Sequence, residues 1–496
     1  MIRETPRAGI PARQQRLKDI MADGHYTRPA ADAIAELTAR LRPVLQDRLS
    51  DQKALLAQHS HGEGLPDAGM PDLVVFPETN EEVAEIARAC SAYQVPMVPF
   101  GAGSSLEGQV AALAGGVSID LLRMDRVLSQ STLSMDCRVQ AGVRRIALNR
   151  HLRDTGMFFP LDPGADASLG GMAATRCSGT NAVGYGTMRD MVLGLTVVTP
   201  DGRIIRTGSR AKKSSTGYDL TRLYIGSEGT LGIITELQLR LVGQPESIFT
   251  STCQFPDLPS AIATASAALL LGLRMVRLEL LDAVQMDACI RWSNLKDMAP
   301  QPTIFVEFHG TANFVREQAD LFRELALEQG STAWKDAETP EDRKTLWAAR
   351  HECYQATMAL APGKKNMGTD ACVPLEHLAE CILDTQADVR ASGLVAPIVG
   401  HVGDGNFHLG ILFDPTDPVE RAKAEALAER VSLRAIGFGG TCSGEHGVGL
   451  HKTRYMKVEH GEAVHVMHAI KSVLDPAGLM NPGKLLPDLM RGTPEG

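Results

Sequence analysis

The stretch HVGDGNFHLG, residues 401–410, places two histidines around an Asp-Gly pair in a run of strand-forming residues. An Asp-Gly pair between such runs predicts a two-residue hairpin turn at Asp404 and Gly405. His401 and His408 would then stand opposite each other on one face, with Cβ atoms about 5 Å apart. Two imidazoles at that separation could bind one metal ion, whereas the plainer alternative is a polar pair across two strands.

The segment GGTCSGEHGVG, residues 439–449, adds Glu445 and His446 on a glycine-flanked turn. Neighbouring side chains on a turn diverge, so we expect Glu445 to face the metal and His446 to face a substrate. Two imidazoles and one carboxylate would leave a catalytic metal with an open position. Zinc, manganese and ferrous iron all accept this donor set, and an ordinary surface turn is the alternative.

Three glycine-rich loops lie in the first half of the chain. GAGSSLEG, residues 101–108, follows the predicted strand PMVPF, and similar loops lie within residues 160–202 and 218–241. Glycine lets a backbone N–H approach a phosphate closely, and serine hydroxyls add donors. The first loop fits neither GxGxxG nor a P-loop, so the usual NAD-binding fold is not predicted. Three such loops suggest an extended ligand wrapped by backbone, with a loop-rich β domain as the alternative.

The helices and strands that must position the histidines, Glu445 and the glycine loops fall into three parts of the chain. Residues 1–67 read as a helical lead-in, because their apolar residues follow a helical period with alternating charge. Residues 68–245 begin with a strand, a helix capped near Thr79 and a second strand, and continue as short β-rich segments. Residues 246–487 alternate strands with long helices. The start of the second part is typical of an α/β nucleotide site, and more than one domain is expected, since 496 residues exceed what one core supports.

Composition narrows the class of protein. The formal net charge of −9 offers no basic surface for nucleic acid. The longest apolar run, residues 261–273, is too short to span a bilayer, so no transmembrane segment is expected. The arginine-rich N-terminus lacks the apolar core of a secretory signal. Nine cysteines without a CxxC pair read as reduced thiols. We therefore expect a cytoplasmic protein, and a peripheral contact with a respiratory membrane stays open.

Six motifs occur in a fixed order: PFGAGSSLEG, DPGADASLGGMAATRCSG, YGTMRD, GYDL, IGSEGTLGIITE and LDPAGLMNPGK. In that order they resemble the FAD-linked oxidases of the vanillyl-alcohol-oxidase and p-cresol-methylhydroxylase superfamily, over about residues 68–487. The resemblance implies a two-part FAD-binding domain and a C-terminal α+β substrate domain with an antiparallel sheet, whose last segment returns to the flavin. It implies FAD contacts from Pro99, Gly101, Gly103, Ser104, Ser105, Pro163, Gly164, Ala165, Ser168, Gly171, Ser178, Gly179, Glu228, Gly229, Ile233 and Asn481.

Some members of this family bond the flavin covalently through a histidine in the first glycine loop. This chain has no histidine between Pro99 and Val110, so the FAD is predicted to be non-covalent.

Within the superfamily, the segment 346–378 together with HVGDGNFH and GEHGVGLHK resembles the D-2-hydroxyacid dehydrogenases, and among these the enzymes that act on D-lactate. The resemblance implies a divalent metal on His401, His408 and Glu445, with His446 as catalytic base and Arg350 as clamp for the substrate carboxylate. Arginine suits that role because its planar fork matches a carboxylate. The expected reaction is oxidation of D-lactate to pyruvate by hydride transfer from C2 to the flavin N5.

Several alternatives stay open on sequence alone. Relatives acting on D-2-hydroxyglutarate carry a lysine at the position of Gly368, although Lys364 and Lys365 lie nearby. A glycolate oxidase flavin subunit, a non-redox alkyl-glycerone-phosphate synthase and a non-catalytic flavin-binding chain are further possibilities. The electron acceptor could be a quinone, a cytochrome or an electron-transfer flavoprotein, and a homodimer is possible.

Overall fold

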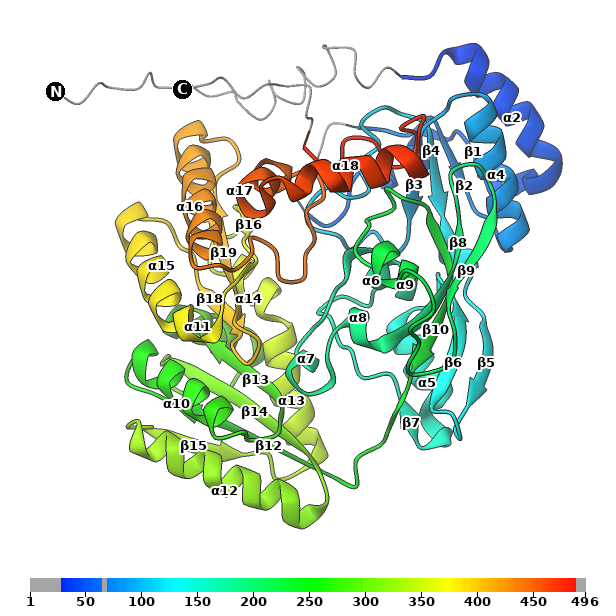
Figure 1. The fold of residues 1–496 in the computed structure, drawn as a ribbon. Helices are drawn as coiled ribbons and strands as arrows, with labels where there is room; N and C mark the ends of the chain where they lie inside the picture. Colours follow the sequence, from blue (N-terminus) through cyan, green and yellow to red (C-terminus); the bar gives the residue numbers. More distant parts are fainter. Residues whose placement is uncertain (1–27, 65–68, 296, 488–496) are drawn as a thin grey trace.

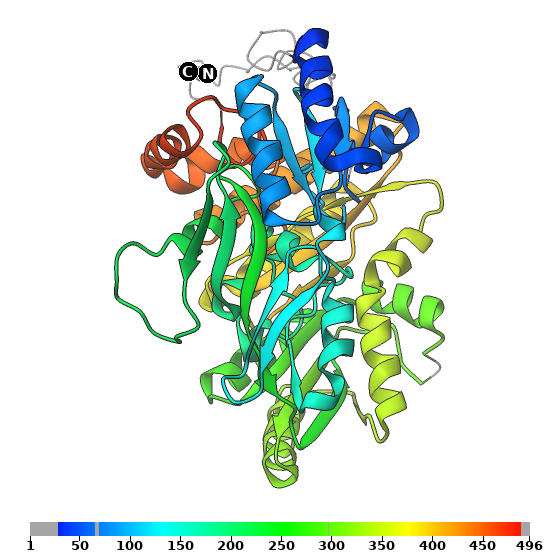
Figure 2. The same ribbon diagram turned by 90° about the vertical axis from the view of Figure 1, so that its right-hand side faces the viewer.

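The structure is a computed structural model that describes residues 28–64, 69–295 and 297–487. The first part of the predicted lead-in, residues 1–27, lies outside the described residues, and helices α2 and α3 lie in its remainder. Three large sheets and one sheet of two short strands organise the described residues. Helices α2 (Ala31–Leu45) and α4 (Asn80–Ala92) lie at the opposite end of the molecule from α12 (Ala312–Glu328) (Figures 1 and 2).

The first sheet has the order β1-β2-β4-β3, in which β2, β4 and β3 run parallel and β1 is an antiparallel edge. Thr79 caps α4 by accepting the N–H of Glu82, as a capping residue should. The first glycine loop leaves the sheet directly after β3. The elements are α2 (Ala31–Leu45), β1 (Leu49–Ser50), α3 (Lys53–Gln58), β2 (Leu73–Val75), α4 (Asn80–Ala92), β3 (Met97–Phe100) and β4 (Val117–Asp120).

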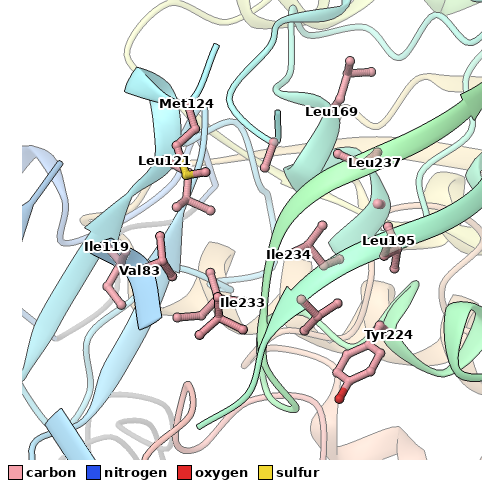
Figure 3. Close-up of a cluster of buried hydrophobic side chains, with 14 of the residues drawn as sticks. Val83, Ile119, Leu121, Met124, Leu169, Leu195, Tyr224, Ile233, Ile234 and Leu237 are labelled. Carbon is pink, nitrogen blue, oxygen red and sulfur yellow. The ribbon is translucent and has the colours of Figure 1, made fainter. Parts of the chain in front are cut away.

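The second sheet is antiparallel, with the order β5-β6-β10-β8-β9. Buried apolar side chains from both sheets form one continuous core, which includes Val83 and Ile119 from the first sheet region and Leu195 and Leu237 from the second (Figure 3). The elements are β5 (Val127–Ser131), β6 (Asp136–Gln140), α5 (Arg145–Leu152), β7 (Met157–Phe158), α6 (Leu169–Thr175), α7 (Ala182–Tyr185), α8 (Met188–Met191), β8 (Val192–Val198), β9 (Ile204–Gly208), α9 (Leu220–Tyr224), β10 (Ile233–Arg240) and β11 (Val242–Gly243).

The third sheet has eight antiparallel strands, ordered β15-β12-β14-β13-β18-β19-β16, with β17 also paired to β19. Helices α10, α12, α15 and α16 share a core with one face, whereas α11, α13 and α14 cover the other. The strands are β12 (Ser247–Gln254), β13 (Met275–Leu281), β14 (Thr303–Gly310), β15 (Ala333–Asp336), β16 (Lys365–Gly368), β17 (Ala371–Cys372), β18 (Ile398–His401) and β19 (Asn406–Phe413). The helices are α10 (Leu258–Leu270), α11 (Ala283–Ser293), α12 (Ala312–Glu328), α13 (Pro340–His351), α14 (Cys353–Ala359), α15 (Leu378–Ser392) and α16 (Pro418–Gly437).

The end of the chain returns to the first sheet through α17 (Met456–His460) and α18 (Ala463–Leu474). Figure 1 shows α18 reaching from the third sheet's helices toward β3 and β4. Met480 then forms a parallel bridge with Met97, and the N–H of Asn481 donates to the Met97 carbonyl at 2.8 Å. Among the described residues, none of the helices combines the length and the apolar character that crossing a membrane requires.

Candidate active site

A cavity of about 1230 Å³ lies where the glycine loops, the third sheet and the returning tail meet. Small-molecule sites typically measure about 300–1000 Å³, so this cavity has room for a large ligand together with a small one. The predicted FAD contacts line it, apart from Ser178 and Ile233. The lining set is Pro99, Gly101, Gly103, Ser104, Ser105, Pro163, Gly164, Ala165, Ser168, Gly171, Gly179, Glu228, Gly229 and Asn481.

Three polar atoms in this lining are buried without a hydrogen-bond partner among the described residues: the hydroxyls of Ser105 and Ser168 and the Oδ1 atom of Asn481. Buried polar atoms almost always have partners, so these three indicate a polar ligand between the loops. A long cofactor rich in phosphate and hydroxyl groups would satisfy them. The residues present therefore fit FAD.

Ile233 does not line the cavity, although the resemblance implied a contact with FAD. Its side chain is fully buried in the core between the first two sheets (Figure 3). Gly232 and Ile234 line the cavity instead. Side chains alternate between the two faces of a strand, so a strand that turns Ile234 toward the ligand must turn Ile233 away.

The predicted hairpin register is wrong. His401 pairs with Asn406, and residues 402–405 form a four-residue loop instead of a two-residue turn. Within it the Asp404 N–H donates to the His401 carbonyl at 3.0 Å, and Gly405 takes the left-handed conformation with φ 77°. His408 still shares a face with His401, because it lies two residues beyond Asn406 on the same strand. Their ring centroids are 5.4 Å apart.

His401, His408 and Glu445 offer ligand atoms within 4.8 Å of one another, as expected for a metal site. The Nε2 atoms of the two histidines lie 3.1 and 3.5 Å from the same Glu445 oxygen, Oε1. Their Nδ1 atoms are held from behind, by Glu279 Oε1 at 2.7 Å and by the Thr369 carbonyl at 3.1 Å. With Nδ1–H donated to these acceptors, both Nε2 lone pairs face one point, and the donor set fits zinc, manganese or iron.

A second group, Asp370 with His408 and His446, also has ligand atoms within 4.8 Å of one another. We favour the first group because the Asp370 carboxylate is already engaged by protein donors. It accepts hydrogen bonds from the Ser443 hydroxyl, the Asn406 amide and the backbone N–H groups of Glu445 and His446. Burial opposes its ionisation, but His446 and Lys452 outweigh burial and lower the pKa of Asp370 to about 2. Asp370 therefore fixes the turn that carries Glu445 and His446.

Three residues of the glycine loops also hold this turn. The Ser178 hydroxyl, implied to contact FAD, instead donates to Glu445 Oε2 at 2.6 Å, beside the Gly179 N–H at 3.0 Å. The Glu228 carboxylate accepts the N–H groups of Val448 and Gly449, both at 2.7 Å. The flavin-side loops and the metal-side turn are thus one hydrogen-bonded unit.

His446 lies against His408, with ring centroids 4.9 Å apart and planes inclined by 9°. Its Nδ1 atom is buried without a hydrogen-bond partner among the described residues, 3.7 Å from Glu107 Oε1. Burial opposes a charge there, but Asp370 and Glu107 outweigh it and raise the pKa of His446. The side chain of His446 lines the cavity, where an imidazole could exchange a proton with a ligand.

Arg350, on α13, lines the same cavity and is 7% exposed. Its Nε and Nη2 atoms donate to Glu279 Oε2 at 2.9 and 2.6 Å. Among the described residues, Nη1 has no hydrogen-bond acceptor, so part of the fork is left for a ligand. The structure thus brings the predicted metal ligands, base and carboxylate clamp together in one cavity.

The sequence did not point to Glu279, Glu107 or Asp370 as parts of the site. Glu279 had a signal in RMVRLELL, where charged residues alternate with Val276, Leu278 and Leu280. That alternation puts Glu279 on the opposite face of β13 from the core leucines. Glu107 lies in the first glycine loop and pairs with the buried Lys452 at 3.0 Å, which local pattern could not indicate.

Residues 71–208 match the FAD binding domain family, and residues 244–485 match the C-terminal domain of FAD linked oxidases. With the relatives below, the chain belongs to the FAD-linked oxidases. It is 46% identical to "Probable D-lactate dehydrogenase, mitochondrial" of Danio rerio, over 92% of each chain. It is 45% identical to the mitochondrial D-lactate dehydrogenase (cytochrome) of Arabidopsis thaliana, over 91% of this chain and 80% of the relative. It is therefore a homologue of FAD-dependent D-lactate dehydrogenases.

A solved structure of p-cresol methylhydroxylase with substrate bound matches 94% of this chain and 99% of its own, with a TM-score of 0.72 and 14% identity. At that identity the match shows the fold alone. The α+β fold and the superfamily expected from the six motifs are confirmed.

The expected cytoplasmic location is wrong, because the Danio rerio and Arabidopsis thaliana relatives are both named mitochondrial. The prediction weighed the arginine-rich N-terminus only against a secretory signal, which needs an apolar core. Mitochondrial transit peptides are arginine-rich and amphipathic and need no such core. Residues 1–27 lie outside the described residues.

Proposed function

We propose that this protein oxidises D-lactate to pyruvate in a reaction that depends on FAD and a divalent metal. The observation that carries the proposal is the meeting of Arg350, His446 and the His401, His408 and Glu445 group in the cavity that the FAD loops line. The names of the two relatives support D-lactate as the substrate.

Two side chains have different roles in the proposed reaction. Arg350 binds the substrate carboxylate through its fork, which orients the 2-hydroxy carbon toward the glycine loops. His446 accepts the proton of the 2-hydroxyl as a general base, a role that imidazole often fills in enzymes. When bound, FAD supplies the hydride acceptor, and the divalent ion supplies a Lewis acid for the hydroxyl oxygen.

Gly368 itself offers no side chain that could bind a second carboxylate of the substrate. Gly368 lines the cavity, and a Cβ at this position would meet nothing within 4 Å. Lys364 is paired with Glu420 and is not in the cavity lining, whereas Lys365 does line it. The second candidate, D-2-hydroxyglutarate, rests on Lys365 as partner of its distal carboxylate.

An anaerobic absorbance spectrum tests substrate and reaction together. We expect D-lactate to bleach the flavin band rapidly, whereas L-lactate leaves it oxidised because its hydrogen and methyl group exchange places. D-2-hydroxyglutarate is the matched control for Lys365. If it bleaches the band faster than D-lactate does, the dicarboxylate is the substrate. A band that none of the three changes contradicts the proposal.

For the electron acceptor we propose a cytochrome, because the Arabidopsis thaliana relative carries that word in its name. Enzyme reduced by D-lactate should then be reoxidised by added cytochrome c. Reoxidation by a quinone analogue but not by cytochrome c would contradict this choice.

Acid precipitation should release all of the flavin into the supernatant, because the loop between Pro99 and Val110 holds no histidine that could bond it. The absorbance of supernatant and pellet at the flavin band measures the result. A pellet that stays yellow after washing in denaturant would show a covalent bond from another residue.

A further inference from the structure

We propose that Glu279 is a positioning residue that couples the metal site to the substrate-carboxylate site. The inference deepens the proposed function and rests on it for the role of Arg350. Its basis is that one buried carboxylate, 1% exposed, serves both sites through different oxygens. Oε1 lies 2.7 Å from His401 Nδ1, and Oε2 accepts from Arg350 Nε and Nη2 at 2.9 and 2.6 Å.

The three side chains are placed by two neighbouring strands and a helix. Glu279 lies on β13 and His401 on β18, which pair through Leu280 with Gly400 and Leu281 with Val399. Side chains alternate, so Glu279 and His401 point to the face that α13 covers and where Arg350 is found. The carboxylate is therefore held by the sheet and cannot follow one partner without leaving the other.

The hydrogen bonds with His401 and with Arg350 need a group that accepts on both sides. A carboxylate has acceptor oxygens only, whereas the Arg350 guanidinium donates only. A His401 that donates Nδ1–H to Glu279 must present an Nε2 lone pair to the Glu445 side, which is the tautomer a metal requires. The negative charge also balances Arg350, since an unpaired buried charge is costly.

Glutamine at this position cannot replace glutamate. Its amide has one oxygen and one NH₂ group, so only one partner can keep an acceptor. If the oxygen faces Arg350, the NH₂ faces His401 and drives its proton to Nε2, where it blocks metal binding. If the oxygen faces His401, the NH₂ faces the Arg350 guanidinium, and two donors then stand against each other without an acceptor. Either orientation removes the acceptor from one site. Because the same side chain serves both sites, the loss at one site also displaces the group that holds the other.

Coupling between two sites is reciprocal in binding free energy. With Glu279 present, metal bound at His401 fixes the carboxylate that orients Arg350, so each ligand should favour the other. Loss of an outer hydrogen-bond partner of a metal ligand typically weakens metal binding about 10- to 100-fold. E279Q should therefore bind Mn²⁺ about 10- to 100-fold more weakly, and should also lose affinity for a small 2-oxo acid.

Glu307 provides a matched control. It lies on β14, the neighbour of β13, is 3% exposed and is tied to Thr250, Trp347 and His309. Like Glu279, it is a buried carboxylate that pairs with a histidine. Unlike Glu279, it has no hydrogen bond to His401, His408, Glu445 or Arg350. E307Q should destabilise the fold without altering either binding constant.

The experiment uses metal-stripped holoflavoprotein of the wild type, E279Q, E279D and E307Q. Equilibrium dialysis measures Mn²⁺ affinity, and titration with pyruvate, read from the shift of the flavin band, measures 2-oxo acid affinity with and without Mn²⁺. We expect E279Q to weaken both, to abolish the mutual enhancement and to leave thermal stability no lower than in E307Q. E279D, which keeps two acceptor oxygens, should recover part of the Mn²⁺ affinity.

Wild-type affinities in E279Q would overturn the proposal, as would equal losses in E279Q and E307Q. If E279Q does not fold, E279D decides: unchanged Mn²⁺ and pyruvate affinities in that variant overturn the proposal. Failure of the proposed function is a separate result. In that case wild-type flavin stays oxidised with D-lactate, whereas the loss of Mn²⁺ affinity in E279Q still occurs.

Discussion

Replacing His446 with alanine is expected to slow flavin reduction by D-lactate about 10²- to 10⁴-fold, the usual contribution of a general base. The imidazole lines the cavity, and its Nδ1 atom has no hydrogen-bond partner among the described residues. The side chains nearest to it, Glu107 and Asp370, are committed to Lys452 and to backbone N–H groups. These two carboxylates are therefore poor substitutes for the imidazole, and the variant should be slow at all concentrations of D-lactate.

Stopped-flow absorbance under anaerobic conditions measures this rate directly. The Mn²⁺ affinity of the variant should stay within a few-fold of the wild type, because His446 is not in the favoured ligand group. His377→Ala, which removes a histidine stacked on Phe438 outside the cavity, is the control and should reduce normally. Reduction of H446A at the wild-type rate would remove His446 from the chemistry.

Removal of the divalent metal should lower flavin reduction by about 10³-fold, since a Lewis acid contributes several kcal/mol and ~4 kcal/mol corresponds to that factor. The flavin itself should stay bound. Its predicted contacts lie on the glycine loops and the returning tail, whereas His401 and His408 lie on β18 and β19.

Dialysis against a chelator followed by addition of Zn²⁺, Mn²⁺ or Fe²⁺ tests this and identifies the active metal. H408A should show the same loss without recovery, because one imidazole ligand is gone. Full activity in protein shown by elemental analysis to contain no divalent metal would contradict the metal role. Recovery of H408A by added Mn²⁺ would point instead to a site without that residue.

The sequence was a good guide wherever a signal was local. Thr79 predicted the start of α4, and the glycines after Phe100 predicted the loop that leaves the first sheet. The hairpin failed because its turn is set by a distant strand. The Val373 N–H donates to the Gly405 carbonyl at 3.0 Å, and a Cβ on Gly405 would lie 2.1 Å from the Val373 oxygen. That contact favours the longer loop over the two-residue turn that Asp404 and Gly405 predict in isolation.

Site residues that belong to a sequence motif could be predicted. Residues that only hold those side chains in place could not. His401, His408 and Glu445 stand in motifs and meet in space. Glu279 has no motif around it, because its partners come from a helix and a strand far along the chain. Only the alternation within β13 indicated that its side chain leaves the core.

The returning tail has a consequence for how the protein is made. Asn481 donates its amide to the carbonyls of Gln109 and Glu228 and adds to the edge of the first sheet, yet it follows them in the chain by 372 and 253 residues. The nascent chain can build its first two sheets early, but these carbonyls lack that donor until residue 481 has been made. Contacts between distant residues also form slowly. Because Asn481 also lines the cofactor cavity, we expect a chain that stops before Met480 to bind FAD more weakly.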